Sequence, residues 1–131
     1  MKPRLLYLTI VAFSFIFSST LVLSQVHVEV KEAFNSGNSA LLAKFFNKNV
    51  ELFINQKEDV YSKAQAELIL KDFFIKHQPD TFLIENQGFS DGINYIIAKL
   101  DTSNGNFRIY ITYRQNAGKN YINRLNITDY K

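Results

Sequence analysis

Two arginines and three aromatic residues lie within a short stretch of the chain, TSNGNFRIYITYR, between Thr102 and Arg114. The guanidinium of an arginine can bind a carboxylate or a phosphate through two parallel hydrogen bonds. A tyrosine ring can stack on another ring or hold a cation over its face. Because successive side chains of a β-strand point to opposite faces of a sheet, the chemistry depends on which of these residues share a face.

The turn before this stretch decides how the two neighbouring strands pair. Asn104-Gly105 is typical of a two-residue hairpin turn and predicts that Leu100 lies opposite Ile109. One face of the hairpin is then apolar, with Thr102 opposite Phe107, Ala98 opposite Ile111 and Ile96 opposite Tyr113. The other face is mixed, with Asp101 opposite Arg108, Lys99 opposite Tyr110, Ile97 opposite Thr112 and Tyr95 opposite Arg114.

A second hairpin adds a third strand to both faces. The three-residue loop Asn116-Ala117-Gly118 predicts that Leu125 lies opposite Ile109 on the apolar face. On the mixed face it places Arg124 opposite Tyr110, and Ile122 opposite Thr112. The mixed face thus gathers six candidate residues for binding a protein partner or a second copy of the chain: Tyr95, Lys99, Arg108, Tyr110, Arg114 and Arg124.

The string GNFRIYITY resembles the strand of RNA-binding sheets on which exposed rings stack against bases. In the register above, however, Phe107 and Ile109 belong to the apolar face. Lys2 and Arg4 lie in a leader segment, and removing them from the 15 basic residues leaves 13 against 12 acidic ones, a net charge of +1. A nucleic-acid interface is therefore not expected.

The rest of the chain holds no motif for metal binding or catalysis. It has two histidines, His27 and His77, and no cysteine, so neither a metal site nor a disulfide is expected. We assign no catalytic residue and expect no cofactor. The carboxylates of Glu51, Asp72 and Glu85 could act as general bases if they were buried, but surface ion pairing is the preferred interpretation of all three.

Residues 1–24 have the layout of a secretory signal peptide. A cationic start is followed by an apolar run from Leu5 to Leu23, and Val22 and Ser24 fit the positions before a cleavage site. Cleavage leaves a single domain, residues 25–131, in the periplasm or outside the cell. The alternative is a retained membrane anchor, because the run approaches the length that spans a bilayer.

The remaining pattern predicts an α+β domain with helices on one face of a mainly antiparallel sheet. Ser36-Gly37-Asn38 should end one helix and begin the next, and Ser62 with Gln65 forms the capping box of a helix that Pro79 ends. The stretch between residue 54 and Ser62 is predicted to be a polar loop. Helices are expected from Val26 to Phe34, around Leu41 to Phe46 and from Ser62 to Pro79; strands are expected from Val50 to Ile54, Thr81 to Gln87, Asn94 to Thr102, Asn106 to Arg114 and Asn120 to Thr128.

Three segments carry a resemblance to a known family: FNSGNSALLAKFFNKNVELFI, VYSKAQAELILKDFF and TSNGNFRIYITY. Together they resemble a family of small exported bacterial domains of unknown function, which is similar to the nuclear-transport-factor-two-like, cystatin-like superfamily. The resemblance spans about residues 26–128. It implies a cone-shaped fold in which N-terminal helices pack in the concave face of a strongly curved sheet. The superfamily contains enzymes and binding domains, and no catalytic motif of those enzymes maps onto this chain.

The preferred functional hypothesis is a non-catalytic exported domain that binds a protein partner or a small ligand, with the mixed face as a partner or homodimer surface. The alternative is a small lyase, isomerase or hydrolase with an aromatic-lined pocket in the cone. That alternative fails if Phe45, Phe46, Phe73 and Phe74 fill the cone. A third hypothesis, a membrane-tethered assembly factor, depends on retention of the leader.

Overall fold

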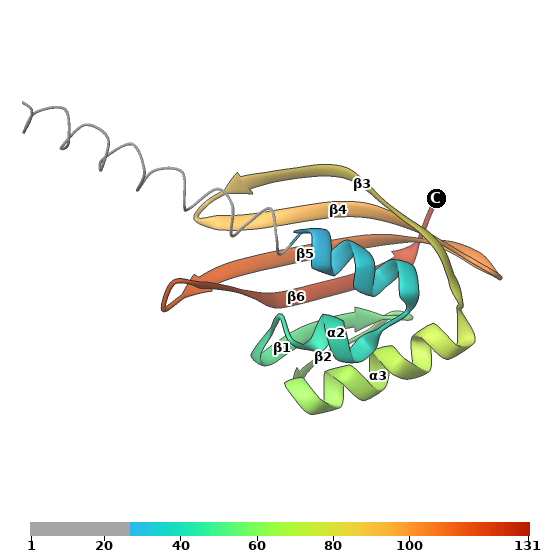
Figure 1. Ribbon diagram of the computed structural model, residues 1–131, viewed down its shortest axis with the longest axis horizontal. Helices are drawn as coiled ribbons and strands as arrows, with labels where there is room; N and C mark the ends of the chain where they lie inside the picture. The colour runs from blue at the N-terminus through green and yellow to red at the C-terminus, as the bar shows by residue number, and fades with distance from the viewer. Residues whose placement is uncertain (1–26) are drawn as a thin grey trace, which may run out of the picture.

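The computed structural model describes residues 27–131, so the predicted signal peptide, residues 1–24, lies outside the described residues. Three helices and six strands make up the described part, which confirms the α+β class. In chain order they are the first helix (residues 27–36), α2 (Ser39–Ala43), β1 (Phe46–Ile54), β2 (Lys57–Ser62), α3 (Lys63–Lys76), β3 (Pro79–Ser90), β4 (Ile93–Thr102), β5 (Gly105–Asn116) and β6 (Lys119–Asp129) (Figure 1).

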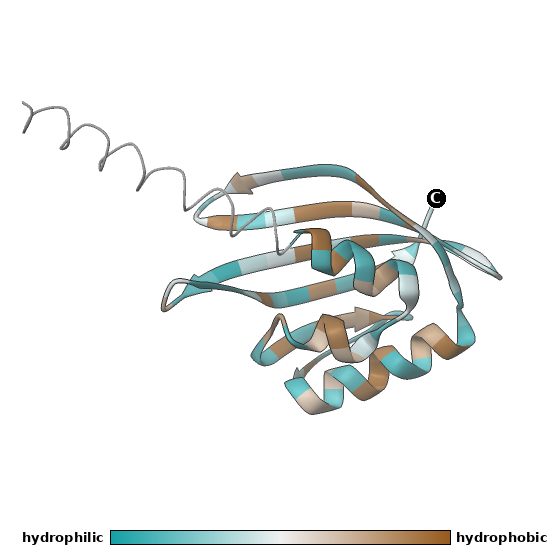
Figure 2. Cartoon of the chain, viewed as in Figure 1, coloured by the Kyte–Doolittle hydropathy of each residue, from teal (hydrophilic) through white to brown (hydrophobic). Residues whose placement is uncertain are grey.

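The six strands form one open sheet in the order β2-β1-β6-β5-β4-β3. All neighbours are antiparallel except β1 and β6, which run parallel. The sheet curves around the helices, which lie on one of its faces (Figure 1). Hydrophobic and hydrophilic residues alternate along the strands (Figure 2), so the helix side of the sheet is apolar and the outer face is mixed.

Side chains cap the helices at the residues that the sequence indicates. Asn38 precedes α2 and accepts a hydrogen bond from the Leu41 N–H at 2.9 Å. The capping box at α3 is complete, because Gln65 N–H donates to the Ser62 hydroxyl and Ser62 N–H donates to the Gln65 side chain. Gly37 takes a left-handed φ of 64° between the first helix and α2, as expected. No helix of the described part is long and apolar enough to cross a membrane.

In the hairpin between β4 and β5, each residue of β4 pairs with a β5 residue two positions earlier in the chain than predicted. Thr102 pairs with Gly105, so Ser103 and Asn104 form the turn, and Leu100 lies opposite Phe107 rather than Ile109. The Thr102 hydroxyl donates to the Gly105 carbonyl at 2.6 Å and closes the turn. The predicted pairs were therefore wrong. The two faces were nevertheless correct, because a slip of two residues leaves every side chain on its own face.

The hairpin between β5 and β6 also differs from the prediction. Ala117 and Gly118 alone form the turn, with φ angles of 50° and 77°, instead of a three-residue loop. Ile109 consequently pairs with Ile127. A bulge at Asn123 then shifts the face of the residues before it, so Ile122 is fully buried in the core rather than on the mixed face.

Two further elements depart from the sequence prediction. The stretch expected to be a polar loop contains β2, which pairs with β1 through a turn at Asn55 and Gln56. Both turn residues have positive φ angles, 54° and 66°, as a tight hairpin requires. Phe46 begins β1 instead of ending a helix, and it is 1% exposed because it packs in the core beside β6.

The backbone of the edge strand β3 is hydrogen-bonded to a side chain of the first helix. The backbone N–H of Phe82 donates a hydrogen bond of 2.7 Å to the side-chain oxygen of Asn35, which lies near the end of the first helix. The Phe82 ring itself is buried and stacks on the ring of Phe34, with 4.6 Å between the ring centroids. The first helix and the edge of the sheet are thus joined by both packing and a hydrogen bond.

Candidate functional site

The six residues that the sequence selects lie on β4, β5 and β6, as the alternation requires. Tyr95 and Lys99 come from β4; Arg108, Tyr110 and Arg114 come from β5; Arg124 comes from β6. Their neighbours in sequence, such as Ile96, Ile109 and Leu125, point to the helices and are fully buried. The six side chains therefore lie on the face turned away from the helices, which we call the outer face.

The charged residues of the outer face pair differently from the prediction. Lys99 lies opposite Arg108, and not opposite Tyr110, because of the register of the hairpin. Two groups balance the like charges: the Asp101 carboxylate lies 3.2 Å from the Lys99 ammonium, and the Tyr130 ring centroid lies 5.2 Å from it. The predicted Asp101 and Arg108 pair is wrong, since Asp101 lies opposite Asn106.

Tyr95 and Tyr110 form a ring pair in the middle of the outer face. Their centroids are 6.4 Å apart and the rings are tilted by 31°. Tyr95 lies opposite Gly88 of β3, and a Cβ atom at Gly88 would lie 2.8 Å from the tyrosine hydroxyl oxygen. The glycine therefore leaves the space in which the Tyr95 ring lies across the edge strand.

Arg124 is held by carboxylates and is not a free cation. Its Nε donates to the Glu51 carboxylate of β1 at 2.7 Å, and a second carboxylate, that of Glu58 of β2, lies 3.9 Å from its terminal nitrogen. The preferred interpretation of Glu51 as an ion-pair partner is confirmed. The same holds for Asp72, which pairs with Lys76 at 2.8 Å. Glu85 instead accepts a hydrogen bond from the Tyr130 hydroxyl at 2.9 Å.

Arg114 lies apart from the other five residues. It pairs with Tyr121 near the turn between β5 and β6, beyond the ring pair, and its side chain is exposed. The structure thus brings Tyr95, Lys99, Arg108, Tyr110 and Arg124 onto the central part of the outer face and leaves Arg114 at its end.

Sequence reasoning selected only Tyr110 from a row of four residues that crosses the centre of the outer face. Register neighbours connect Phe53 of β1 to Asn126, Asn126 to Tyr110, and Tyr110 to Ile97. All four are half-buried although no described helix covers them. We call Phe53, Asn126, Tyr110 and Ile97 the central row. Ile97 was visible as an apolar residue on a mixed strand face, but the parallel pairing of β1 with β6 had no sequence signal.

Aromatic rings fill the inside of the curved sheet. Phe46, Phe73 and Phe74 are buried, Phe45 is partly buried, and Phe34 packs edge-on against Phe74 with 5.9 Å between the centroids. These rings occupy the volume that a ligand pocket in the cone would need. The described residues contain no group of three or more His, Cys, Asp or Glu side chains that could hold a metal ion.

One tyrosine hydroxyl lies within this apolar interior. Tyr113 is fully buried, and its hydroxyl has no hydrogen-bond partner. Burial therefore raises the pKa of Tyr113 well above its usual value and keeps the phenol neutral. His27, at the start of the described chain, places its ring centroid 6.0 Å from that of Tyr113, and burial lowers the pKa of His27 below 6.5.

The lowered pKa of His27 predicts a loss of stability in acid. The unfolded chain binds a proton at His27 near pH 6.5, whereas the folded chain resists protonation. This contribution to stability is present above the unfolded pKa and is lost as the pH falls through the lowered folded value. Urea midpoints measured between about pH 5 and pH 8 should therefore fall toward acid. The His27→Gln variant should show a flatter profile, and identical profiles for both proteins would contradict the prediction.

Comparisons with known proteins agree with this architecture. A family model described as a domain of unknown function, DUF4783, matches residues 27–128. A solved structure of this family from Bacteroides uniformis is 33% identical, with a TM-score of 0.75, and the match covers 79% of this chain and 95% of that one. A second, from Bacteroides fragilis, is 33% identical with a TM-score of 0.75, covering 79% of this chain and 97% of that one.

More distant structures share the fold alone. An NTF-2 like protein of unknown function from Silicibacter pomeroyi is 13% identical, with a TM-score of 0.61, and the match covers 88% of this chain and 98% of that one. No curated protein matches the chain. The expected resemblance is confirmed: with a family model matched over nearly all the described residues, the chain belongs to DUF4783, a domain of unknown function with a nuclear-transport-factor-two-like fold.

Proposed function

We propose that this protein is a non-catalytic binding domain that is exported and forms a homodimer through its outer face. The central row is the observation that carries the proposal. It places three large apolar or aromatic side chains and one carboxamide across four adjacent strands, on a face that no described helix covers. An apolar centre with a charged rim is the usual composition of a protein interface.

The charges around the central row favour a second copy as the partner. On the β1 and β2 side of the outer face, Arg124 offsets only one of the two charges of Glu51 and Glu58. On the β4 and β5 side, Asp101 offsets the charge of Lys99 and leaves that of Arg108. A two-fold axis that runs along the strands lays the acidic side of one copy over the basic side of its partner. The outer face is thus complementary to itself in charge, and its centre is apolar in both copies.

Charge reversal at Arg108 should weaken this dimer. Arg108 is exposed and has no carboxylate within ion-pair distance among the described residues, so the Arg108→Glu variant leaves the fold intact and places like charges on both sides. Sedimentation equilibrium of the protein isolated from cells that express the full-length gene should show a dimer that Arg108→Glu weakens about tenfold or more.

The matched control is Lys31→Glu, which reverses an exposed charge on the first helix, on the opposite side of the sheet. It should leave the dimer unchanged. Increasing salt should weaken the wild-type dimer, because the charges on the rim are exposed. A monomer at about 100 μM wild-type protein would overturn the proposal, as would equal self-association of the wild type and Arg108→Glu.

A further inference from the structure

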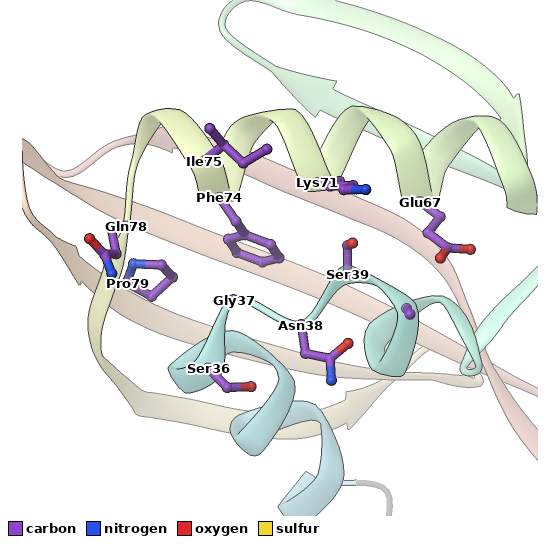
Figure 3. Close-up of a pocket in the computed structure, with 11 residues that line it drawn as sticks. Ser36, Gly37, Asn38, Ser39, Glu67, Lys71, Phe74, Ile75, Gln78 and Pro79 are labelled. Carbon is purple, nitrogen blue, oxygen red and sulfur yellow. The ribbon is translucent and has the colours of Figure 1, made fainter.

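A second surface feature lies among the helices, away from the outer face. It is an open groove of about 650 Å³ between α3 and the turn that joins the first helix to α2 (Figure 3). This volume lies within the range of small-molecule sites. Its lining combines the apolar side chains of Phe74 and Ile75, at the C-terminal end of α3, with the charged side chains of Glu67 and Lys71, which lie nearer the start of the same helix.

A close contact between the turn and β3 shapes the bottom of the groove. Gly37 has a left-handed φ, and a Cβ atom there would lie 3.3 Å from Cδ of Pro79 and 3.5 Å from Cβ of Phe74. The backbone of the turn therefore lies directly against these two side chains. Phe74 is 5% exposed and belongs to the core, so the apolar floor of the groove is fixed by the packing of the domain.

Glu67 and Lys71 give the groove one negative and one positive group. The sequence predicts that these residues pair with each other, because they lie one helical turn apart. In the described part, however, no ion pair or side-chain hydrogen bond involves either residue, and the pair found on α3 is Asp72 with Lys76. Both residues line the groove, and the Glu67 side chain extends from α3 toward α2 (Figure 3). The two charges are thus available to a ligand.

The groove also borders apolar surface that the core does not use. Ile75 lines the groove and is 72% exposed. The Asn38 side-chain nitrogen, whose partner oxygen caps α2, and the carboxamide of Gln78 lie at the same groove and offer hydrogen bonds beside this apolar surface. Opposite charges, amide-binding groups and an apolar surface within one groove match the chemistry of a peptide.

We propose that the groove binds a short peptide with free termini and an apolar C-terminal side chain. Its ammonium group lies at Glu67, its carboxylate at Lys71, and its side chain on Phe74, Ile75 and Pro79. The spacing supports this arrangement, since one helical turn rises about 5.4 Å. Two residues of an extended chain span about 6.6 Å, which is close to that separation.

The experiment is an NMR titration of isotope-labelled protein, isolated from cells that express the full-length gene, with alanyl-leucine. The expected shifts lie at the backbone amides of residues 36–40 and 67–79. N-acetyl-alanyl-leucinamide, which lacks both charges, should bind about tenfold more weakly or not at all. Glu67→Gln and Lys71→Gln should each weaken binding of the free dipeptide, whereas Asp72→Asn, on the same helix, should leave it unchanged.

Three results would overturn the inference: no shifts at about 10 mM dipeptide, shifts centred on other residues, or equal binding of the free and capped peptides. The inference stands independently of the homodimer, because the groove and the outer face are different surfaces. Arg108→Glu should keep its affinity for the dipeptide even when it no longer dimerises. Loss of both dimerisation and dipeptide binding in Arg108→Glu would contradict the independence of the two surfaces.

Discussion

Replacing Phe34 with alanine is expected to lower the free energy of unfolding by about 4 kcal/mol. The side chain is fully buried, stacks on Phe82 with an interplanar angle of 7°, and meets Phe74 edge-on. Alanine would leave a cavity between the first helix, α3 and β3, because side chains of α3 and β3 pack against this ring. Urea denaturation followed by circular dichroism measures the loss.

Phe89→Ala is the matched control, since this ring is 68% exposed near the end of β3. Its effect should stay within about 0.5 kcal/mol, as for other surface substitutions. Phe34→Leu should fall between the two variants because it restores part of the lost volume. Equal effects of Phe34→Ala and Phe89→Ala would show that the first helix does not pack on the sheet as described.

Replacing Asn104 with alanine is expected to lower the free energy of unfolding by about 2 kcal/mol. The Asn104 carboxamide joins the β4 and β5 hairpin to the end of α3. Its oxygen lies 2.7 Å from Nδ1 of His77, and its nitrogen donates to the Lys76 carbonyl at 3.0 Å. Alanine removes both contacts and leaves the Lys76 carbonyl without this donor. Thermal or urea unfolding gives the size of the effect.

Ser103→Ala tests whether the effect belongs to the Asn104 side chain or to the turn. Ser103 occupies the same turn but contributes through its backbone, whose N–H donates to the Gln78 carbonyl at 3.0 Å. Its substitution should change stability by no more than about 0.5 kcal/mol. The Nδ1 proton of His77 should also exchange faster with solvent in Asn104→Ala only. Equal losses in both variants would contradict the role of the carboxamide.

This contact also explains why the hairpin register could not be predicted. Asn104-Gly105 has the local signature of a turn centre. The Asn104 side chain, however, contacts His77, the residue that caps α3 and precedes Asn104 by 27 positions. Local turn statistics do not contain such a contact. The alternation of apolar and polar residues survives a slip of two positions, so the faces could still be read correctly although the partners were wrong.

Features within a few residues of each other were the ones that the sequence predicted well. The caps at Asn38 and Ser62 follow from local hydrogen bonds and were confirmed. The strand β2 was missed because its residues are almost all exposed and carry no apolar alternation. The central row and the contact between Arg124 and Glu51 depend on parallel pairing of β1 with β6, which joins residues more than 70 positions apart.

The hydrogen bond between Asn35 and Phe82 has a consequence for aggregation. A long edge strand offers unpaired backbone groups to any other chain with a free strand, which is a route to fibrils. On β3, the Asn35 side chain occupies the position that the carbonyl of an incoming strand would take. Another strand could add at Phe82 only by displacing the first helix from the edge. The first helix therefore blocks strand addition at this point of the edge.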